Sequence, residues 1–136
     1  MASFSAFLDV HGQQYPLLGY DLSLHQETDS LGRPASPTMG GTVTCILSAP
    51  GSDKSFLHQW MLSPTMQQDG KIILMRDSPK ATLKTISFFN ACCVGLQTRF
   101  VAGAGGGGSM QMTIRISPQR VAIGAIIHDN NWPLDK

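Results

Sequence analysis

The chain has little of what nucleic-acid-binding and membrane proteins need. Only 14% of its 136 residues are charged, and the formal net charge is +1. A surface with so little charge creates no field that would gather nucleic acid or an anionic membrane. No apolar run approaches the roughly 20 residues of a transmembrane helix. We therefore expect no binding to nucleic acid and no membrane insertion.

The first residues do not follow the pattern of a signal peptide. "MASFSAFLDVHGQQ" lacks a basic segment, and Asp9 interrupts its apolar side chains. We therefore expect no Sec-type signal peptide. The three cysteines, Cys45, Cys92 and Cys93, match no metal-binding spacing. Buried reduced thiols are the favoured interpretation, which indicates synthesis in a reducing compartment.

Residues in catalytic or metal-binding patterns are also lacking. The four histidines are isolated from one another, and no HExxH or GxSxG motif occurs. The nine carboxylates are scattered, so a catalytic pair could form only from distant strands. The sequence predicts no catalytic residue, no cofactor and no metal site, and hence a protein that is not an enzyme.

One low-complexity segment is present, "GAGGGGS" at Gly103–Ser109. It lacks the Lys-Ser/Thr pair of a phosphate-binding loop, and a strand pattern rather than a helix follows it. We interpret it as a flexible hairpin connection.

Most of the chain alternates between apolar and polar residues, as half-buried strands do. "SFSAFLDV" places Phe4, Ala6, Leu8 and Val10 on one face, and "MQMTIRIS" places Met110, Met112, Ile114 and Ile116 on one face. "HGQQ" is typical of a hairpin turn. In "YPLLGYDLSL", Pro16 and Gly19 favour an edge strand or a bulged strand over a regular central one.

The second half of the chain continues this strand pattern. "KIILMRD", "ATLKTISFFNACCVGLQTRF" and "RVAIGAII" are each predicted to be one strand. The apolar phase changes near Phe88-Phe89, which indicates a bulge there or a long strand with two partners. About seven strands and one helix predict a mostly β sandwich or barrel in a single domain, residues 1–136.

A single helix is predicted at "SDKSFLHQWML". Phe56, Leu57, Trp60 and Met61 recur at helical spacing, so they should pack one stripe against a sheet. Ser52 can cap the start, with Asp53 near the positive end of the dipole, and Ser63-Pro64 ends the segment.

The segment "LHQETDSLGRPASPTMGGTV", Leu24–Val43, has few apolar residues and lies between two predicted strands. Connections of this length inside a compact domain are uncommon and are usually functional or disordered.

The order of these segments resembles the Hcp/TssD family, the tube proteins of the type VI secretion system, and in particular the Bacteroidetes members. The similarity rests on "SFSAFLDV", "YPLL", "TDSLGRPASPTMGG", "FLHQW" and the closing "NNWP", and it extends over nearly the whole chain. It implies a two-sheet Hcp-like β-barrel with one flanking α-helix and a long extended loop.

The resemblance also implies an assembly. Hexameric rings would stack into a tube inside a contractile sheath, in contact with spike and baseplate proteins, and small effector proteins would travel in the lumen. The protein would assemble in the cytoplasm and be secreted without a signal peptide. Two alternatives remain open: a phage-type tail-tube protein, and a small β-barrel enzyme or ligand-binding module whose long loop is a lid.

In the family the long loop reaches neighbouring subunits, which on this chain implies an arm at Gln26–Gly41. Pro34 and Pro37 would stiffen it, Leu31 and Met39 would be apolar anchors, and Arg33 would donate to a neighbour's carboxylate or carbonyls. The expected interface residues are Asp29, Leu31, Arg33, Pro34 and Met39.

Overall fold

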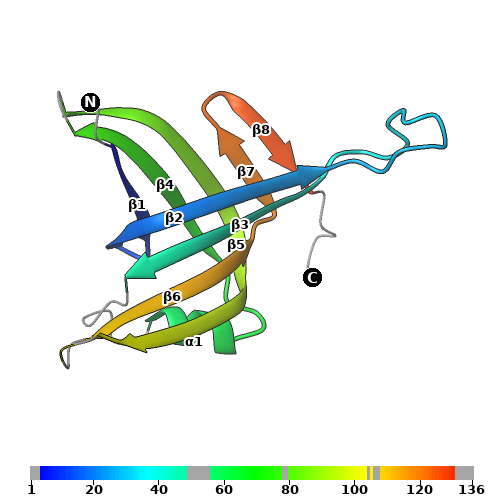
Figure 1. Ribbon diagram of the computed structural model, residues 1–136. Helices are drawn as coiled ribbons and strands as arrows, with labels where there is room; N and C mark the ends of the chain where they lie inside the picture. Colours follow the sequence, from blue (N-terminus) through cyan, green and yellow to red (C-terminus); the bar gives the residue numbers. More distant parts are fainter. Residues whose placement is uncertain (1–3, 49–55, 78–79, 104, 106–107, 131–136) are drawn as a thin grey trace.

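Six strands close into a ring in the computed structural model, which describes residues 4–48, 56–77, 80–103, 105 and 108–130. Around this ring the order is β1, β2, β3, β6, β5 and β4, with β4 paired again to β1 (Figure 1). The strands of the ring are β1 Phe4–Val10, β2 Gln13–His25, β3 Met39–Ser48, β4 Gln68–Asp77, β5 Lys80–Ala102 and β6 Gly108–Ser117. A hairpin of β7 Arg120–Ile123 and β8 Ile126–Asp129 extends from β5. The predicted β-barrel is confirmed.

Two long strands belong to both halves of the barrel. β2 pairs with β1 through residues 13–16 and with β3 from Leu17 onward. β5 pairs with β4 and β7 up to Ala91 and with β6 from Cys92 onward. The apolar phase of β5 changes between Phe88 and Ala91, where Asn90 has a φ of 51°. The expectation of a long strand with two partners is therefore confirmed.

One detail of the strand prediction is confirmed and another was wrong. β2 is bulged between Leu17 and Gly19 as expected, and beyond Leu17 it pairs only with β3. Pro16 ends the pairing with β1 just before the pairing with β3 begins, so its missing N–H falls where the partners change. "RVAIGAII" is a hairpin rather than one strand, because Gly124, with a φ of 62°, turns the chain between β7 and β8.

The other predicted turns lie where expected. His11 and Gly12 connect β1 to β2 with φ values of 55° and 71°, as a tight two-residue hairpin turn requires. β5 and β6 pair to Ala102 and Gly108, so the glycine-rich segment is a hairpin connection. Met110 was expected to face inward, but it is 46% exposed because it lies beyond the end of the core.

The helix α1, Phe56–Leu62, packs against β5 and closes one end of the barrel (Figure 1). Phe56, Leu57 and Trp60 are buried, and Met61 packs partly against the same cluster. The Trp60 Nε1–H donates to the Ala91 carbonyl at 3.1 Å. The helix ends before Ser63-Pro64 as predicted, whereas the expected cap at Ser52 and Asp53 lies outside the described residues.

Replacing Trp60 tests this packing. We expect Trp60→Ala to lower the free energy of unfolding by about 3 to 5 kcal/mol, because a fully buried ring and its hydrogen bond are lost. Leu62→Ala on the same helix is the control, since Leu62 is 81% exposed and its loss should change stability by no more than about 0.5 kcal/mol. Denaturant unfolding measures both. Equal effects would contradict the orientation of the helix.

Gly70 in β4 lies directly beneath the Phe88 ring. A Cβ atom at Gly70 would lie 2.6 Å from Phe88 Cζ and 2.7 Å from the Asp9 carbonyl oxygen. We expect Gly70→Ala to cost about 1 to 3 kcal/mol, because the backbone oxygen leaves no room for relief. Gly19→Ala is the matched control, since its Cβ would meet only Ile46 Cδ1, at 3.9 Å. A neutral Gly70→Ala in thermal unfolding would contradict this packing.

Candidate functional site: the arm between β2 and β3

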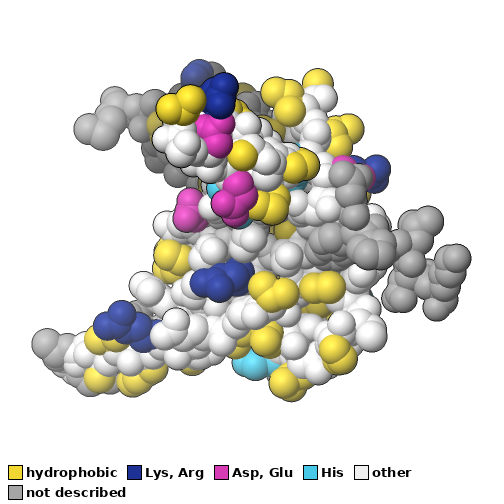
Figure 2. Space-filling view, turned by 90° about the vertical axis from the view of Figure 1, so that its right-hand side faces the viewer, with side chains coloured by type: hydrophobic (Ala, Val, Ile, Leu, Met, Phe, Trp, Pro, Cys, Tyr) yellow, Lys and Arg dark blue, Asp and Glu magenta, His cyan; other side chains and the backbone are white. Residues whose placement is uncertain are grey.

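The segment between β2 and β3 projects away from the barrel as an arm, defined here as residues 26–38 (Figure 1). It continues the β2–β3 hairpin, whose last strand pair is His25 with Met39. Figure 2 faces the side from which the arm extends, where most of the surface is uncharged and charged side chains are few. An arm that rests on no other part of its own barrel must hold its shape by its own contacts.

The two sides of the arm are joined by short polar contacts along its length. The Ala35 N–H donates to the Glu27 carbonyl at 2.7 Å, and the Glu27 N–H donates to Ser36 Oγ at 2.8 Å. Gln26 Nε2 donates to Thr38 Oγ1 at 2.6 Å. These hydrogen bonds hold the two sides of the arm next to each other.

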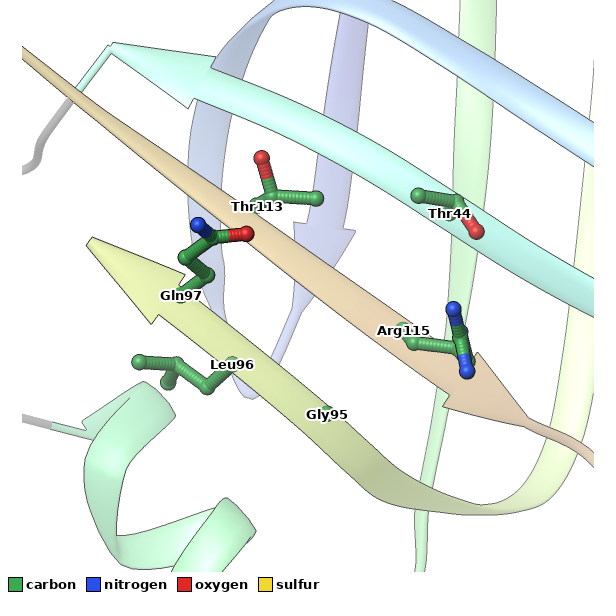
Figure 3. A pocket seen from close by; sticks show the side chains of 6 residues that line it. All are labelled: Thr44, Gly95, Leu96, Gln97, Thr113 and Arg115. Carbon is green, nitrogen blue, oxygen red and sulfur yellow. The ribbon is translucent and has the colours of Figure 1, made fainter. Parts of the chain in front are cut away.

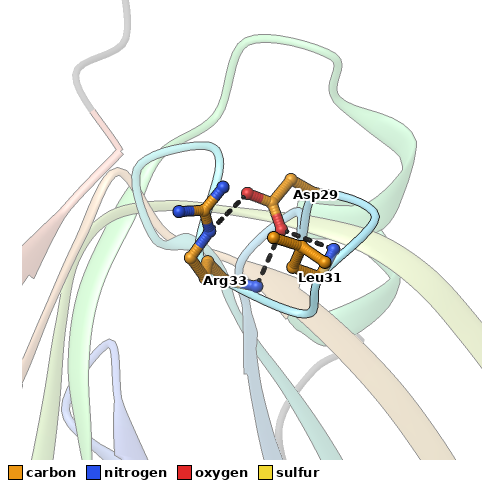
Figure 4. A network of polar contacts seen from close by, with 3 residues as sticks. All are labelled: Asp29, Leu31 and Arg33. Atoms are coloured by element: carbon orange, nitrogen blue, oxygen red, sulfur yellow. Dashed lines mark hydrogen bonds and ion pairs between the residues drawn. The ribbon is translucent and has the colours of Figure 1, made fainter.

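The tip of the arm is organised around one carboxylate. Asp29 Oδ1 accepts from the N–H groups of Leu31 and Arg33 at 2.9 and 3.0 Å, and Arg33 Nε donates to Oδ2 at 2.9 Å (Figure 4). The Asp29 N–H donates to the Arg33 carbonyl at 2.9 Å, which closes the turn. Gly32, with a φ of 83°, allows the chain to reverse. We call this group of contacts the Asp29 clasp.

The clasp changes the acidity of its carboxylate. The hydrogen bond from the Arg33 N–H is the main cause that lowers the pKa of Asp29 below its ordinary 3.8. Desolvation opposes it, and the hydrogen bonds from the Leu31 N–H and the Arg33 side chain add to the lowering. The ionised form of Asp29 is favoured in the folded arm. The clasp is therefore complete when the pH is above the ordinary pKa of Asp29, and it is lost as the pH falls through the lowered pKa.

The root of the arm is fastened to the far end of the chain. Asn130 Nδ2 donates to the Gly40 carbonyl at 2.7 Å and to the Pro118 carbonyl at 3.0 Å, while Asn130 Oδ1 lies 2.8 Å from His128 Nε2. Gly40 and Gly41 have φ values of 105° and 80° beside a register shift in β2. A Cβ atom at Gly40 would lie 2.8 Å from the Ser23 carbonyl oxygen, so only glycine fits.

Comparison with known proteins identifies the group to which this chain is related. The family model of the hemolysin coregulated protein Hcp (TssD) matches residues 2–133. The chain belongs to the Hcp/TssD family. Hcp1 from Flavobacterium johnsoniae, a member of the Bacteroidetes, has a similar structure with a TM-score of 0.83 and 29% identity, over 93% of this chain and 99% of that one. The predicted resemblance is confirmed.

More distant structures share the fold of this Hcp/TssD protein. Hcp1 from Salmonella typhimurium is 12% identical with a TM-score of 0.67, over 89% of this chain and 85% of that one. A sheath/tube terminator of an extracellular contractile injection system is 18% identical with a TM-score of 0.64, over 88% of this chain and 93% of that one. A search of curated protein sequences finds no match. The family is that of the type VI secretion tube proteins.

The expected interface residues of this Hcp/TssD protein do not all lie together. Asp29, Leu31 and Arg33 meet in the clasp, and Pro34 pairs with Thr28 next to it. Leu31 is 75% exposed at the tip. Met39 lies at the root, half-buried as the first residue of β3. Arg33 was expected to donate to a neighbouring subunit, and in the folded chain its Nε donates to Asp29 of its own arm.

The described part of the protein contains possible metal ligands and cysteines. No group of three or more His, Cys, Asp or Glu side chains that could hold a metal occurs in it, and no helix in it could cross a membrane. Burial raises the pKa of the Cys45 thiol to about 12 and raises the pKa of Cys93, so both remain protonated at neutral pH. These two thiols act as small apolar side chains.

Asp29→Ala tests the clasp. We expect the substitution to release the Leu31 and Arg33 amides, so that their hydrogen exchange accelerates, while global stability changes by no more than about 0.5 kcal/mol. Wild-type protein brought below the lowered pKa of Asp29 should show the same release. Glu27→Ala is the control, because the contacts of Glu27 with Ala35 and Ser36 are made by its backbone. Unchanged exchange in Asp29→Ala would exclude the clasp.

Proposed function

We propose that this protein is the structural subunit of a type VI secretion tube, assembling into hexameric rings that stack, with the arm as the contact between subunits. The observation that most supports this role is the pre-formed arm, which holds its shape by internal hydrogen bonds and exposes Leu31 at its tip. A rigid arm loses little conformational entropy when it docks, so a modest apolar contact is enough to hold it.

Ring closure needs two different patches on each subunit, one that reaches out and one that receives. The arm is the first patch. For the second we propose the sheet edges that have one partner in the described chain: β2 beyond Leu17, which pairs only with β3, and β8, which pairs only with β7. Ile126 and Ile127 on β8 are 73% and 63% exposed, and such apolar edges are costly unless a partner covers them.

The remaining parts of the proposal follow the family. The tube would be a structural part rather than an enzyme, would need no cofactor, and would contact sheath, spike and baseplate proteins. It would assemble in the cytoplasm and be secreted, with small effector proteins in its lumen. Two parts of an extracellular contractile injection system and the tube-terminating cap of an anti-feeding prophage share this fold at 16 to 19% identity, which keeps a tail-tube role in a related machine as the second candidate.

A ligand-binding module with the arm as a lid is disfavoured. The arm extends away from the barrel (Figure 1), and the hollow on the sheet surface is lined by Thr44, Gly95, Leu96, Gln97, Thr113 and Arg115, none of which belongs to the arm.

The proposal is tested by the oligomeric state. Purified protein should scatter light as a ring-sized particle, and negative-stain images should show annuli with a central hole. Leu31→Asp should abolish the rings, because a charge cannot enter an apolar contact without a partner, while the folded subunit remains. Ser30→Asp, which places the same charge one residue earlier on the exposed tip, should leave them intact. Subunits that stay single at high concentration would contradict the proposal.

A further inference from the structure

A hollow lies on the surface of β3, β6 and β5 that faces away from the core (Figure 3). It has a volume of about 200 Å³. Cys45, Ile114 and Ile116 on these strands are buried, so by alternation Thr44, Thr113 and Arg115 point to the opposite face. Figure 3 shows Thr113 and Gln97 at one end of the hollow and Arg115 with Thr44 at the other.

The hollow exists because of one glycine at a bulge. Gly95 pairs with Arg115, and the register of β5 shifts between Cys93 and Gly95. A Cβ atom at Gly95 would lie 3.3 Å from Arg115 Cβ, closer than side chains usually approach. The absent side chain leaves space directly beside the arginine, and an added Cβ atom would press against Arg115.

Arg115 has no partner of its own. Within the described residues no hydrogen bond or ion pair engages its guanidinium group. The register places Asp21 of β2 on the far side of Thr44, two strand spacings from Arg115, and the two side chains form no ion pair. A cation is thus presented in a concave site beside two hydroxyl groups and an amide.

We propose that this hollow binds the carboxylate of an acidic side chain, Glu or Asp, from a bound polypeptide. A guanidinium group matches a carboxylate with two parallel hydrogen bonds. Thr44, Thr113 and Gln97 supply further donors around the same space. One positive charge balances one carboxylate, whereas a phosphate dianion would remain only half neutralised.

The site is made by one subunit, so it goes beyond the proposed ring and does not depend on it. If the polypeptide is a cargo, the preference would be for segments that expose Glu or Asp. If it is a second copy of this chain, the acid would come from that copy's surface.

Saturation-transfer NMR on a small ligand tests the proposal, because it works for single subunits and for large assemblies. N-acetyl-glutamate N-methylamide should give saturable transfer at low salt, with a dissociation constant on the order of millimolar. Arg115→Gln should weaken this binding about tenfold or more, since a charge-assisted contact is lost. Arg99→Gln is the matched control, because Arg99 lies on the same face of β5 two residues after Gln97 and should leave binding unchanged.

Two further measurements show whether the glutamate analogue binds in the hollow or is only attracted by the charge of Arg115. Gly95→Ala keeps the arginine but fills the space beside it, so it should also abolish saturable binding. N-acetyl-glutamine N-methylamide should not bind measurably. Equal binding by the neutral analogue, equal losses in Arg99→Gln and Arg115→Gln, or unchanged binding in Gly95→Ala would each overturn the proposal. Inorganic phosphate binding more tightly than the glutamate analogue would overturn the assignment to a carboxylate.

Acidic peptides distinguish the two sources of the carboxylate. A peptide of residues 26–38 competes with the glutamate analogue if the arm of a second copy supplies the acid. Competition only by unrelated Glu-rich peptides would point to cargo. Failure of every acidic peptide to compete would show that polypeptides do not use the site and would overturn the proposal.

Discussion

The sharing of β2 and β5 between both halves of the barrel is the constraint on which the rest of the structure depends. Each of these two strands pairs with one neighbour over part of its length and with another over the rest. The same two strands therefore join the two halves of the barrel into a closed ring. Bulges at Leu17/Gly19 and Cys93/Gly95 and the positive φ of Asn90 absorb the change of direction. The arm and the β5–β6 hairpin are continuations of these fixed strands, and the hollow beside Arg115 is a consequence of one bulge.

The arm that we propose as the contact between subunits is held in shape by few residues. The Asp29 clasp shapes the tip, Ser36 and Thr38 join the two sides, and Asn130 holds the root. All of these are polar contacts, and apart from the Asn130 tie they join residues close in the sequence. They order the arm within its own subunit, so in the proposed ring little further entropy would be lost on docking and the exposed Leu31 would supply the contact.

Much of the barrel could be predicted because its strands have one buried face. Leu8, Val10, Ile114 and Ile116 are buried as their alternation indicated, and the helical spacing around Trp60 placed the helix. The β7–β8 hairpin could not be foreseen, because Gly124 interrupts a continuous apolar run without any polar turn residue. The tie between Asn130 and Gly40 joins residues 90 apart, which no local pattern shows. The clasp could have been predicted from the sequence, because Asp29 is followed four residues later by Arg33 with Gly32 between them. The hollow at Gly95 could not, because apolar alternation does not show where a bulge lies.

A cryo-EM reconstruction of the assembled protein tests the central claim most directly, because it shows where residues 26–38 lie. We expect each arm to rest on a neighbouring subunit, with the contacts of Asp29 to Leu31 and Arg33 retained and Leu31 covered. An arm folded back on its own barrel, or rings closed by other surfaces while the arm remains in solvent, would contradict it.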